Sequence, residues 1–510
     1  MAVWAFVAIF LLGAGARAVD VWRGADGAVR DSWRECDIAA VARNFYREGM
    51  NILYPRIDWR GEGPGYAEME FPLLPWMMAA SYEVGGGVHE VNGRVMSYLF
   101  SLATLLVFFS LARRLLPWEG ALAASLFFAL SPLSIRISNA LQSEGLMFLG
   151  YVLAAYAFLR WLDEDSGAWF GVAAAATALA ILAKATAAHI GLLFLLLLLE
   201  RRGRSALRAP RVWAFAAIAL LPGILWYLHA RGLWLRYGNS LGVSNESHWV
   251  GRDFFTDPTF ILGITRLELL RVWMPAGALV AAAGVLARPA PRAVRTALYW
   301  LAGIGIYYLA AARTTGDSWA VYYHVVAVPP AALLFGAGAA WVMRRIRVLP
   351  ASLERGWAGI GGAALTVGLA AAMALAFADM LRADVRLARP HGMRGQYACA
   401  QSFARHVPED ALILATGGTC VDASGRPVAY NASYMFYWMD RKGFNICRQE
   451  RSLEKVRSFV ARGAKFFVAE KRALDGDPAF RDAMLRTYPI VAECPVAYLF
   501  RLEPAPGAAP

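Results

Sequence analysis

The sequence predicts a polytopic α-helical membrane protein of about 11 transmembrane helices that ends in a small soluble α/β domain. Hydrophobic residues make up 58% of the 510 residues and charged residues only 17%, whereas a soluble domain is typically about 45–50% apolar. Apolar runs that approach the roughly 20 residues needed to cross a bilayer recur through the first three-quarters of the chain. After residue 380 the composition becomes that of a soluble domain.

The formal net charge is +13, and a strongly basic chain raises the question of nucleic-acid binding. Here, however, the arginines lie at the ends of apolar runs instead of forming a patch on a soluble surface. This placement is typical of membrane proteins that obey the positive-inside rule. We therefore expect a lipid bilayer, and no nucleic acid, as the partner of these residues.

The first apolar run, Val3 to Val19, ends in the small residues AGARAV. It is either a retained transmembrane helix or a cleavable secretory signal, and the missing basic n-region favours the helix. Both interpretations place the following segment, Asp20 to Phe71, outside the cytoplasm. Further spans are predicted at about 93–112, 119–133, 143–161, 168–183, 187–200, 212–230, 270–287, 296–312, 320–343 and 357–377.

The arginine-rich loops give the orientation of these spans. Counting alternately from an external first loop puts Arg113–Arg114, Arg201 to Arg211, Arg288 to Arg295 and Arg344 to Arg355 on one side. The arginine excess makes that side cytoplasmic. The acidic stretch 163–165 falls on the same side, but acidic residues influence orientation little. We expect a multi-pass inner-membrane protein whose other face is periplasmic.

We predict a transmembrane domain over residues 1–379 with two external loops, 20–92 and 231–268. In the first loop, the apolar segment LLPWMMAASYEVG is too short and too proline-broken to cross, so it should lie at the interface or re-enter. The second loop has the mixed character of an amphipathic interfacial helix, although a plain connecting loop is an open alternative. Its informative residues are Trp234, His248, Trp249, Asp253 and Phe254–Phe255.

Residues 380–503 are predicted to form a periplasmic α/β domain, and residues 504–510 a disordered tail. ALILATG, KFFVAE and VAYLFRLEP have the pattern of short strands, and SLEKVRSFVARG that of an amphipathic helix. Four of the five cysteines lie in this segment without CxxC or Cys/His metal spacing. One or two disulfides are expected if it is periplasmic, but their pairing stays open.

Acidic side chains gather on the predicted external side. Asp37 begins a helical pattern, so it is a candidate for chemistry or, equally, for a simple capping role shared with Glu35. Glu68 and Glu70 directly precede the apolar segment of the first loop, and Glu144 lies at the external mouth of the fourth span. Charged groups at membrane helices are costly, so each is a candidate functional residue.

Cationic and aromatic residues are predicted at the same face. Arg136 precedes the fourth span, Lys184 ends another helix, and Arg313 flanks a turn. Snorkelling to the interface is an alternative role for Lys184 and Arg313. The run Tyr322, Tyr323 and His324 enters a late span, where a buried tyrosine pair is often simple packing.

Together these residues suit transfer of a group from an anionic lipid carrier. A carboxylate would accept the proton of an attacking hydroxyl, and cations would stabilise a phosphate leaving group. The sequence contains no P-loop, no GxGxxG motif after a strand, no HExxH motif and no GxSxG motif, each of which would indicate another chemistry. A site at the membrane face also leaves the lipid tail in the bilayer.

Several segments occur in an order that resembles the GT-C class of integral-membrane glycosyltransferases. They are CDIAAVARNF, EFPLLPW, NGRVMSYLFSLAT, ALSPLSIRISNALQSEGLMF, LAKATA, LPGILWYLHA and YYHVVAVPP. The resemblance covers residues 1–345 and is to the branch of the protein O-mannosyltransferases (dolichyl-phosphate-mannose-protein mannosyltransferase-like) and the lipid A aminoarabinose transferases. Each motif alone is weak, whereas their order is fairly specific.

The resemblance implies a catalytic Asp37, with Cys36 where relatives often have a second acid. It also implies that Glu144, the acidic residue after the SP-containing span, is catalytic and that Lys184 contacts the carrier phosphate. By analogy, Arg136 and Arg313 are further phosphate-binding candidates, and the residues expected to line the cavity are Glu68, Glu70, Tyr322, Tyr323 and His324. Because the relatives differ in metal use, a divalent metal cofactor is left open.

The resulting hypothesis is an inverting transferase that moves a sugar from a polyprenyl-phosphate donor to a hydroxyl acceptor at the periplasmic face. The acceptor, whether protein, lipid or glycan, is not indicated by the sequence. Two alternatives are a transporter or flippase of a lipid-linked saccharide and a non-catalytic scaffold for envelope assembly. A transporter would move its substrate without cleaving a bond, and a scaffold would need no cavity beside Asp37.

Overall fold

The computed structural model describes residues 2–19, 21, 32–243, 249, 257–287, 289–348, 357–387, 393–421 and 433–503. Contacts divide the chain into two compact units. The bundle unit comprises residues 1–21, 94–225 and 248–389, and the sheet unit comprises residues 22–93, 226–247 and 390–510. Each unit therefore joins segments that are far apart in sequence.

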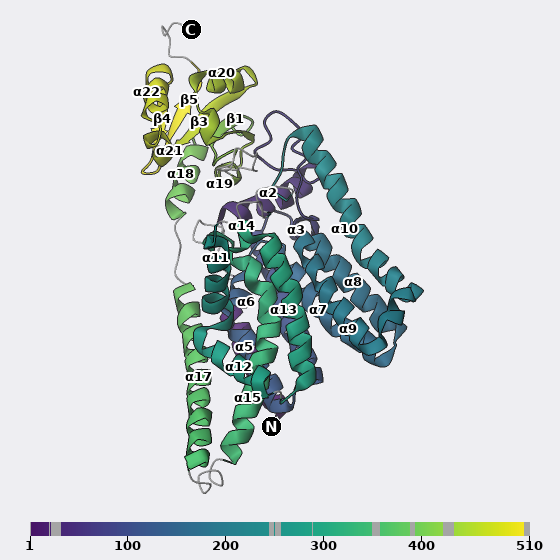
Figure 1. Ribbon diagram of the computed structural model, residues 1–510. Helices are drawn as coiled ribbons and strands as arrows, with labels where there is room; N and C mark the ends of the chain where they lie inside the picture. The colour runs from purple at the N-terminus through teal and green to yellow at the C-terminus, as the bar shows by residue number, and fades with distance from the viewer. Residues whose placement is uncertain are drawn as a thin grey trace. The chain divides into compact units, whose positions relative to one another are not determined.

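The bundle unit consists of helices of very different lengths (Figure 1). Short 3-10 or π-helical stretches precede several of them, namely η1 (Ala185–His189), η2 (Arg204–Arg208), η5 (Glu268–Trp273) and η6 (Ser318–Ala327). The α-helices are α1 (Ala2–Ala18), α4 (Glu90–Leu115), α5 (Trp118–Leu130), α6 (Pro132–Ile137), α7 (Glu144–Glu164), α8 (Gly167–Ala183), α9 (Ile190–Arg202), α10 (Pro210–Tyr237), α11 (Thr259–Leu267), α12 (Pro275–Ala287), α13 (Pro291–Ala310), α14 (Ala312–Thr315), α15 (Val328–Arg347) and α17 (Trp357–Leu387).

Each span predicted from hydropathy coincides with a helix, which confirms a polytopic helical fold. Within the described residues, five helices are long and apolar enough to cross a membrane, or six if one bent pair is a single span. The number of actual crossings stays a prediction. The predicted span 270–287 is not one straight helix, because the segment Thr259–Trp273 is bent by 86° from α12. The bend occurs at Met274, a buried residue with a φ of 52°.

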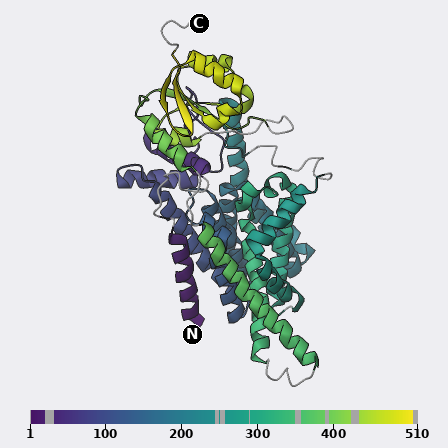
Figure 2. The same ribbon diagram turned by 90° about the vertical axis from the view of Figure 1, so that its left-hand side faces the viewer.

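Close helix packing in the bundle unit depends on small residues. A Cβ atom on Gly338 of α15 would lie 1.9 Å from the carbonyl oxygen of Val280 in α12. Only glycine therefore allows these two backbones to approach so closely, as is common between membrane helices. α1 and α17 are each continuous helices (Figure 2).

α1 is fixed in the bundle unit by Arg17, which is fully buried. The Arg17 guanidinium donates to the hydroxyls of Ser101 in α4 (2.9 Å) and Ser134 in α6 (2.7 Å), and to the carbonyl of Ala129 in α5 (2.6 Å). A buried cation is tolerated only when its donors find partners. These bonds make α1 a packed member of the bundle.

Ion pairs join the ends of the helices that lie next to the arginine-rich loops. Asp163, at the end of α7, pairs with Arg114 of α4 (2.8 Å) and Arg292 of α13 (2.6 Å). Asp165 pairs with Arg202 of α9 (2.7 Å). The acidic stretch 163–165 thus neutralises part of the arginine cluster on its own side, and α7 runs from this end to Glu144 at the opposite end.

The sheet unit contains a five-stranded mixed sheet with the order β2-β1-β3-β5-β4. β1 pairs in parallel with β2 and β3, whereas β5 is antiparallel to both β3 and β4. Figure 1 shows the helices α20, α21 and α22 around this sheet. The elements of this segment are α18 (Arg394–Ala404), β1 (Leu412–Thr416), α19 (Ser433–Met439), β2 (Gly443–Ile446), η7 (Arg448–Glu450), α20 (Leu453–Ala461), β3 (Ala464–Glu470), α21 (Lys471–Asp475), α22 (Pro478–Thr487), β4 (Ile490–Glu493) and β5 (Ala497–Arg501).

The three predicted strands and the predicted helix of this segment are present, which confirms a small α/β domain. Ser452 caps α20 by accepting a hydrogen bond from the backbone of Lys455 (3.1 Å), as an N-cap serine does. The sequence did not reveal β2 and β4. GFNI and IVAE are only four residues long, too short to show an alternation of burial.

The first loop contributes α2 (Ser32–Glu48) and α3 (Leu73–Gly85) to the sheet unit. α2 begins at least five residues before Asp37, so the prediction that Asp37 starts the helix is wrong and Glu35 is the acid in its first turn. α3 has 13 residues, about 20 Å at 1.5 Å per residue, too short to cross a bilayer. Of the predicted interfacial residues of the second loop, His248, Asp253 and Phe254–Phe255 lie outside the described residues, and Trp249 is exposed.

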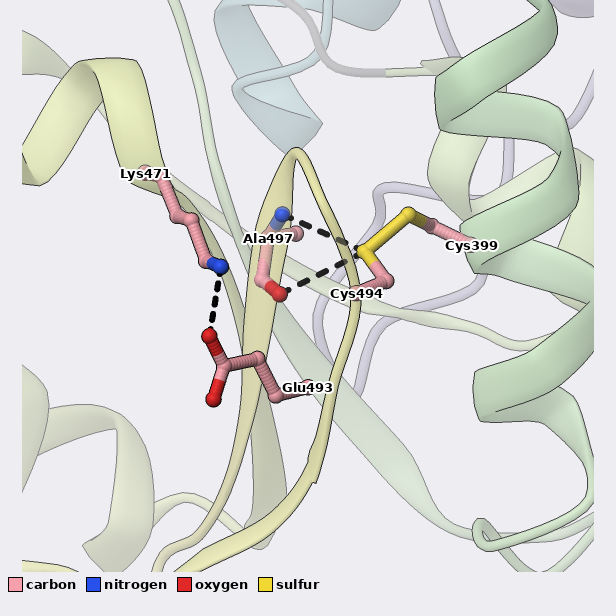
Figure 3. The surroundings of a disulfide bond; sticks show 5 residues. All are labelled: Cys399, Lys471, Glu493, Cys494 and Ala497. Atoms are coloured by element: carbon pink, nitrogen blue, oxygen red, sulfur yellow. Dashed lines mark hydrogen bonds and ion pairs between the residues drawn. A yellow bond between two sulfur atoms is a disulfide. The ribbon is translucent and has the colours of Figure 1, made fainter.

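Two disulfides join the four cysteines of the C-terminal segment. Cys399 of α18 pairs with Cys494 in the turn between β4 and β5, and Cys420 pairs with Cys447. Figure 3 shows the first disulfide, where the backbone N–H of Ala497 donates to the sulfur of Cys494 (3.2 Å). The expectation of one or two disulfides thus has a definite pairing, with Cys36 left as a buried thiol.

Candidate functional site

The bundle unit brings Glu144 and Lys184 into direct contact. Glu144 is the first residue of α7, and Lys184 is the C-cap of α8, where the chain leaves the helix in an extended conformation. The Lys184 ammonium donates to Glu144 Oε1. Both side chains are buried, with 7% and 1% of their surface exposed. Lys184 therefore does not snorkel to the interface, and its charge is kept inside the protein by a carboxylate.

Two tyrosines complete the surroundings of the Lys184 ammonium. Its nitrogen lies 5.0 Å from the ring centroid of Tyr322 and 4.2 Å from that of Tyr323. The two rings are stacked on each other with centroids 4.6 Å apart. Because the faces of aromatic rings attract cations, the tyrosine pair stabilises the charge as well as packing the core.

His324 forms a separate polar contact on the same stretch, η6. Its Nε2 lies 2.8 Å from the carbonyl oxygen of Thr315, and its Nδ1 lies 2.7 Å from Glu268 Oε1. A carbonyl oxygen only accepts, so Nε2 carries a proton. Trp273 also donates to Glu268 (2.9 Å). His324 is fully buried, and these contacts fix its ring.

Arg136 and Arg313 lie on short helices that contact η6. Arg136 is in α6 and Arg313 is in α14, and both helices pack against η6. Both side chains are half-buried. The bundle unit therefore gathers the carboxylates of Glu144 and Glu268 and the cations of Lys184, Arg136 and Arg313 on elements around η6, at the end of the bundle opposite the arginine-rich loops.

In the sheet unit, Asp37 is buried in α2, with 2% of its surface exposed. The indole N–H of Trp59 donates to Asp37 Oδ1 (3.0 Å). Cys36, the preceding residue, is also buried, and burial, followed by the charges of Glu90 and Asp37, raises the pKa of its thiol well above the ordinary value. Cys36 therefore stays neutral and does not replace the second acid of the relatives.

Glu68 and Glu70 lie in the sheet unit with separate partners. Glu68 has 1% of its surface exposed and accepts a hydrogen bond from the hydroxyl of Ser240. Its backbone N–H donates to the carbonyl of Asn239 (3.0 Å), so Glu68 joins the first loop to the segment after α10. Glu70 pairs with Arg34 of α2 (3.3 Å).

A second buried charge cluster in the sheet unit was not recognised in the sequence. Asp58 accepts hydrogen bonds from Arg43, from Asn44 (2.9 Å) and from Lys442. Burial by itself would raise the pKa of Asp58, but the charges of Arg43 and Lys442 outweigh it and lower that pKa below the ordinary value. Lys442 is 384 positions from Asp58, so no local sequence signal indicates this pairing.

Other residues of the site also escaped the sequence analysis. Glu268 is an acid within the apolar run RLELLRVW, and an acid in such a run is a candidate functional residue. The sequence pattern instead predicts the end of an external loop at this position. Trp59 can be recognised as a residue of the site only from its hydrogen bond to Asp37 in the structure. For a metal, the described residues contain no group of three or more His, Cys, Asp or Glu side chains that could hold one ion.

Comparisons with known proteins agree with this architecture. Residues 69–227 match the family model described as dolichyl-phosphate-mannose-protein mannosyltransferase. The structure of ArnT from Cupriavidus metallidurans in the apo state is similar, with a TM-score of 0.63, 16% sequence identity and 98% of each chain covered. The same protein bound to undecaprenyl phosphate has a TM-score of 0.62 at 14% identity, covering 98% of this chain and 97% of that one.

A more distant similarity is to the archaeal oligosaccharyltransferase AglB from Archaeoglobus fulgidus, in complex with an inhibitory peptide and a dolichol-phosphate. The TM-score is 0.58 at 13% identity, with 92% of this chain and 69% of that chain covered. No curated protein matches the chain in sequence. The fold is thus that of the GT-C class of integral-membrane glycosyltransferases. Within that class, the fold is similar to that of ArnT.

Proposed function

We propose that this protein is a membrane glycosyltransferase that moves a sugar from a polyprenyl-phosphate donor to a hydroxyl acceptor at the periplasmic face of the inner membrane. The observation that carries the proposal is the buried Lys184–Glu144 pair with its tyrosines. It lies in a bundle whose fold is shared with ArnT bound to undecaprenyl phosphate.

The charges around η6 suit a phosphate that gains charge as it leaves. Lys184, Arg136 and Arg313 supply positive charge on the elements around η6, where Glu144 and Glu268 supply the negative charge. A polyprenyl-phosphate sugar is a phosphodiester with one negative charge, and the departing polyprenyl phosphate has up to two. Cations placed where charge develops favour the transition state over the ground state.

Glu144 has a positioning role in this proposal. The carboxylate holds the Lys184 ammonium in place before the donor binds, at a buried position where an unpaired ammonium would be costly. Lysine has three N–H donors, so the ammonium can keep Glu144 while it also donates to a phosphate oxygen. The ion pair therefore prepares the cation for the leaving group.

Asp37 is the proposed general base. The acceptor hydroxyl attacks the anomeric carbon, its proton passes to Asp37, the carbon–oxygen bond to phosphate breaks, and the electron pair leaves with the phosphate oxygen. Attack opposite the leaving group inverts the anomeric configuration. The bond from Trp59 orients the Asp37 carboxylate.

Two features support the proposed orientation, one in each unit. Its two disulfides are typical of an oxidising compartment such as the periplasm. In the bundle unit, the Glu144 and Lys184 end lies opposite the arginine-rich loops, and an excess of arginine marks the cytoplasmic side. Reporter fusions after residue 50 and after residue 205 test this orientation, because the two fusions should report opposite sides.

The proposal is tested with the donor from cells. Lipids extracted from a strain that lacks the protein should accumulate one polyprenyl-phosphate sugar, and the purified protein in nanodiscs should transfer that sugar to an envelope acceptor. Release of free polyprenyl phosphate together with a new glycoside is the expected result. Movement of the intact lipid between leaflets without bond cleavage would contradict the proposal and indicate a flippase.

A further inference from the structure

A cavity of about 410 Å³ lies wholly within the sheet unit. This volume falls in the range of small-ligand sites, roughly 300–1,000 Å³. Three separate segments line it: the loop after α2, the end of α10, and the α/β segment. Its lining includes the aromatic residues Trp59, Trp234 and Tyr237, the amide Asn445, the cations Lys455 and Arg462, and the acid Glu450.

Backbone contacts hold two of these walls together. The N–H of Gly61 donates to the carbonyl of Gly443 (2.5 Å), and the N–H of Gly443 donates to the carbonyl of Asp58 (3.2 Å). Gly61 has a φ of +62°, and a Cβ atom there would lie 2.8 Å from the ring of Phe444. The loop after α2 is therefore fixed against β2, so the cavity is a preformed feature of the unit.

Aromatic side chains form one part of the lining. Trp59, Trp234 and Tyr237 are half-buried, so part of each side chain stays accessible. Tyr237 is held by an edge contact with Tyr66 at 5.1 Å between ring centroids. Half-exposed aromatic rings with a polar tip suit a ligand that has both apolar C–H faces and hydroxyl groups, which describes a saccharide.

Cations form another part of the lining. The Arg462 guanidinium lies 4.8 Å from the ring centroid of Phe444, and the Lys455 ammonium lies 5.4 Å from that of Phe459. Their acidic partners, Glu62 (2.8 Å) and Glu450 (3.2 Å), are exposed. Exposed ion pairs contribute only about 0–1 kcal/mol, so an anionic group of a ligand can take the place of either partner.

Asn445 of β2 is a polar group in the lining that the described residues do not satisfy. It has 7% of its surface exposed, and neither the amide nitrogen nor the amide oxygen of its side chain has a hydrogen-bond partner in the described part of the chain. A buried polar group without a partner costs about 1–3 kcal/mol. A ligand hydroxyl, which both donates and accepts, would remove this cost.

Trp59 connects the cavity to the proposed base. Its ring lines the cavity, and its indole N–H bonds to Asp37. We propose that the cavity binds an anionic saccharide and, if the proposed transferase function holds, that it is the subsite for the saccharide part of the acceptor. The aromatic rings contact the sugar faces, and Lys455 and Arg462 contact a phosphate or carboxylate substituent.

Binding is tested on the full-length protein in nanodiscs without any donor lipid. The probes are N-acetylglucosamine, N-acetylglucosamine 1-phosphate and inorganic phosphate, measured by calorimetry. We expect the sugar phosphate to bind at least about tenfold more tightly than either of the other two, a difference of about 1.4 kcal/mol. Equal affinity for all three probes, no binding of any, or tighter binding of an acidic peptide of the same charge would overturn the assignment.

Matched variants place the binding in the cavity. Trp234→Ala and Arg462→Gln should each weaken the sugar phosphate about tenfold. The controls are Trp213→Ala, an exposed tryptophan of α10 in the bundle unit, and Arg457→Gln, an exposed arginine on α20 that does not line the cavity. Both controls should bind as the unchanged protein does. Unchanged affinity in Trp234→Ala and Arg462→Gln would place the ligand elsewhere and refute the proposal.

Transfer kinetics separate this proposal from the proposed function. In an active preparation, Trp234→Ala and Arg462→Gln should raise the KM for the acceptor about tenfold and leave the KM for the donor lipid unchanged. If that acceptor KM does not move, the cavity assignment fails while the transferase stands. If no sugar is transferred but both variants lose the sugar phosphate, the transferase proposal fails while the binding site stands. A glycolipid and a free saccharide acceptor, assayed in parallel, distinguish the source of the anionic sugar.

Discussion

The two units each bury a cluster of charges, and the two clusters are built differently. In the sheet unit, both oxygens of Asp58 are occupied, one by Arg43 and the other by Asn44 and Lys442. In the bundle unit, Lys184 meets one carboxylate oxygen and the faces of two tyrosines. The first arrangement holds distant parts of the unit together, whereas the second leaves N–H donors of a cation for a ligand.

The difference shows that burial of a charge does not by itself identify a functional residue. Both clusters contain buried charges, which are costly unless paired. What separates them is the kind of partner: charge-assisted hydrogen bonds saturate Asp58, whereas ring faces attract Lys184 without using its donors in ordinary hydrogen bonds. Variants at the two clusters should therefore affect different measured quantities.

The largest effect is expected for Asp37→Asn. Asparagine can still accept the bond from Trp59 but cannot take a proton, and general-base catalysis is typically worth about 10²- to 10⁴-fold. We expect kcat to fall at least about 100-fold with donor binding unchanged, measured with labelled donor lipid. Asp482→Asn, an exposed aspartate of α22, is the matched control. Near-normal turnover of Asp37→Asn would remove the proposed base.

Asp58→Asn should affect stability instead of chemistry. The change removes the buried counter-charge of Arg43 and Lys442, which keep the more exposed Asp440 (2.8 Å) and Glu48 (3.6 Å) as acidic partners. Breaking a buried ion pair typically costs about 3–5 kcal/mol. We expect a thermal transition several degrees lower, measured by scanning fluorimetry in detergent, with nearly normal turnover per folded molecule. Loss of turnover without loss of stability would show that the Asp58 cluster, like the Lys184 cluster, serves the reaction and not only the fold.

Lys184→Met should reduce both stability and activity, because it removes the proposed phosphate contact and leaves Glu144 buried without its cation. The double variant Glu144→Gln/Lys184→Met separates the two effects, since both new side chains are neutral. We expect the double variant to recover most of the thermal stability while turnover stays roughly 10- to 100-fold low. Recovery of turnover in the double variant would mean that Lys184 serves only the fold.

The smallest effect is a pH dependence of the sheet unit. Because the pKa of Asp58 is lower in the folded protein than its unfolded value of about 3.9, its stabilisation is fully present above about pH 4 and is lost as the pH falls further. The thermal transition should thus change little between pH 7 and pH 5 through this group. Below about pH 4, the difference between the unchanged protein and Asp58→Asn should shrink. A constant difference would contradict the role of the Asp58 carboxylate.

The sequence predicted the parts of the site that depend on local patterns. Hydropathy located the helices, and the rule that charges at membrane helices are costly identified Glu144 and Lys184 individually. The sequence pattern placed the start of α2 wrongly at Asp37, because the apolar periodicity becomes clear only after that residue. The catalytic and phosphate-binding roles of these residues, including Asp37, stay predictions that the variants above address.

What the sequence determined by itself is the set of elements: an apolar run of about 20 residues must satisfy its backbone internally in a bilayer, and a helix does so within the run. Only the tertiary structure decided which elements meet. The pair of Lys184 with Glu144 spans 40 positions, and the disulfide of Cys399 with Cys494 spans 95. Such contacts depend on packing across the whole chain, for which a local pattern carries no information.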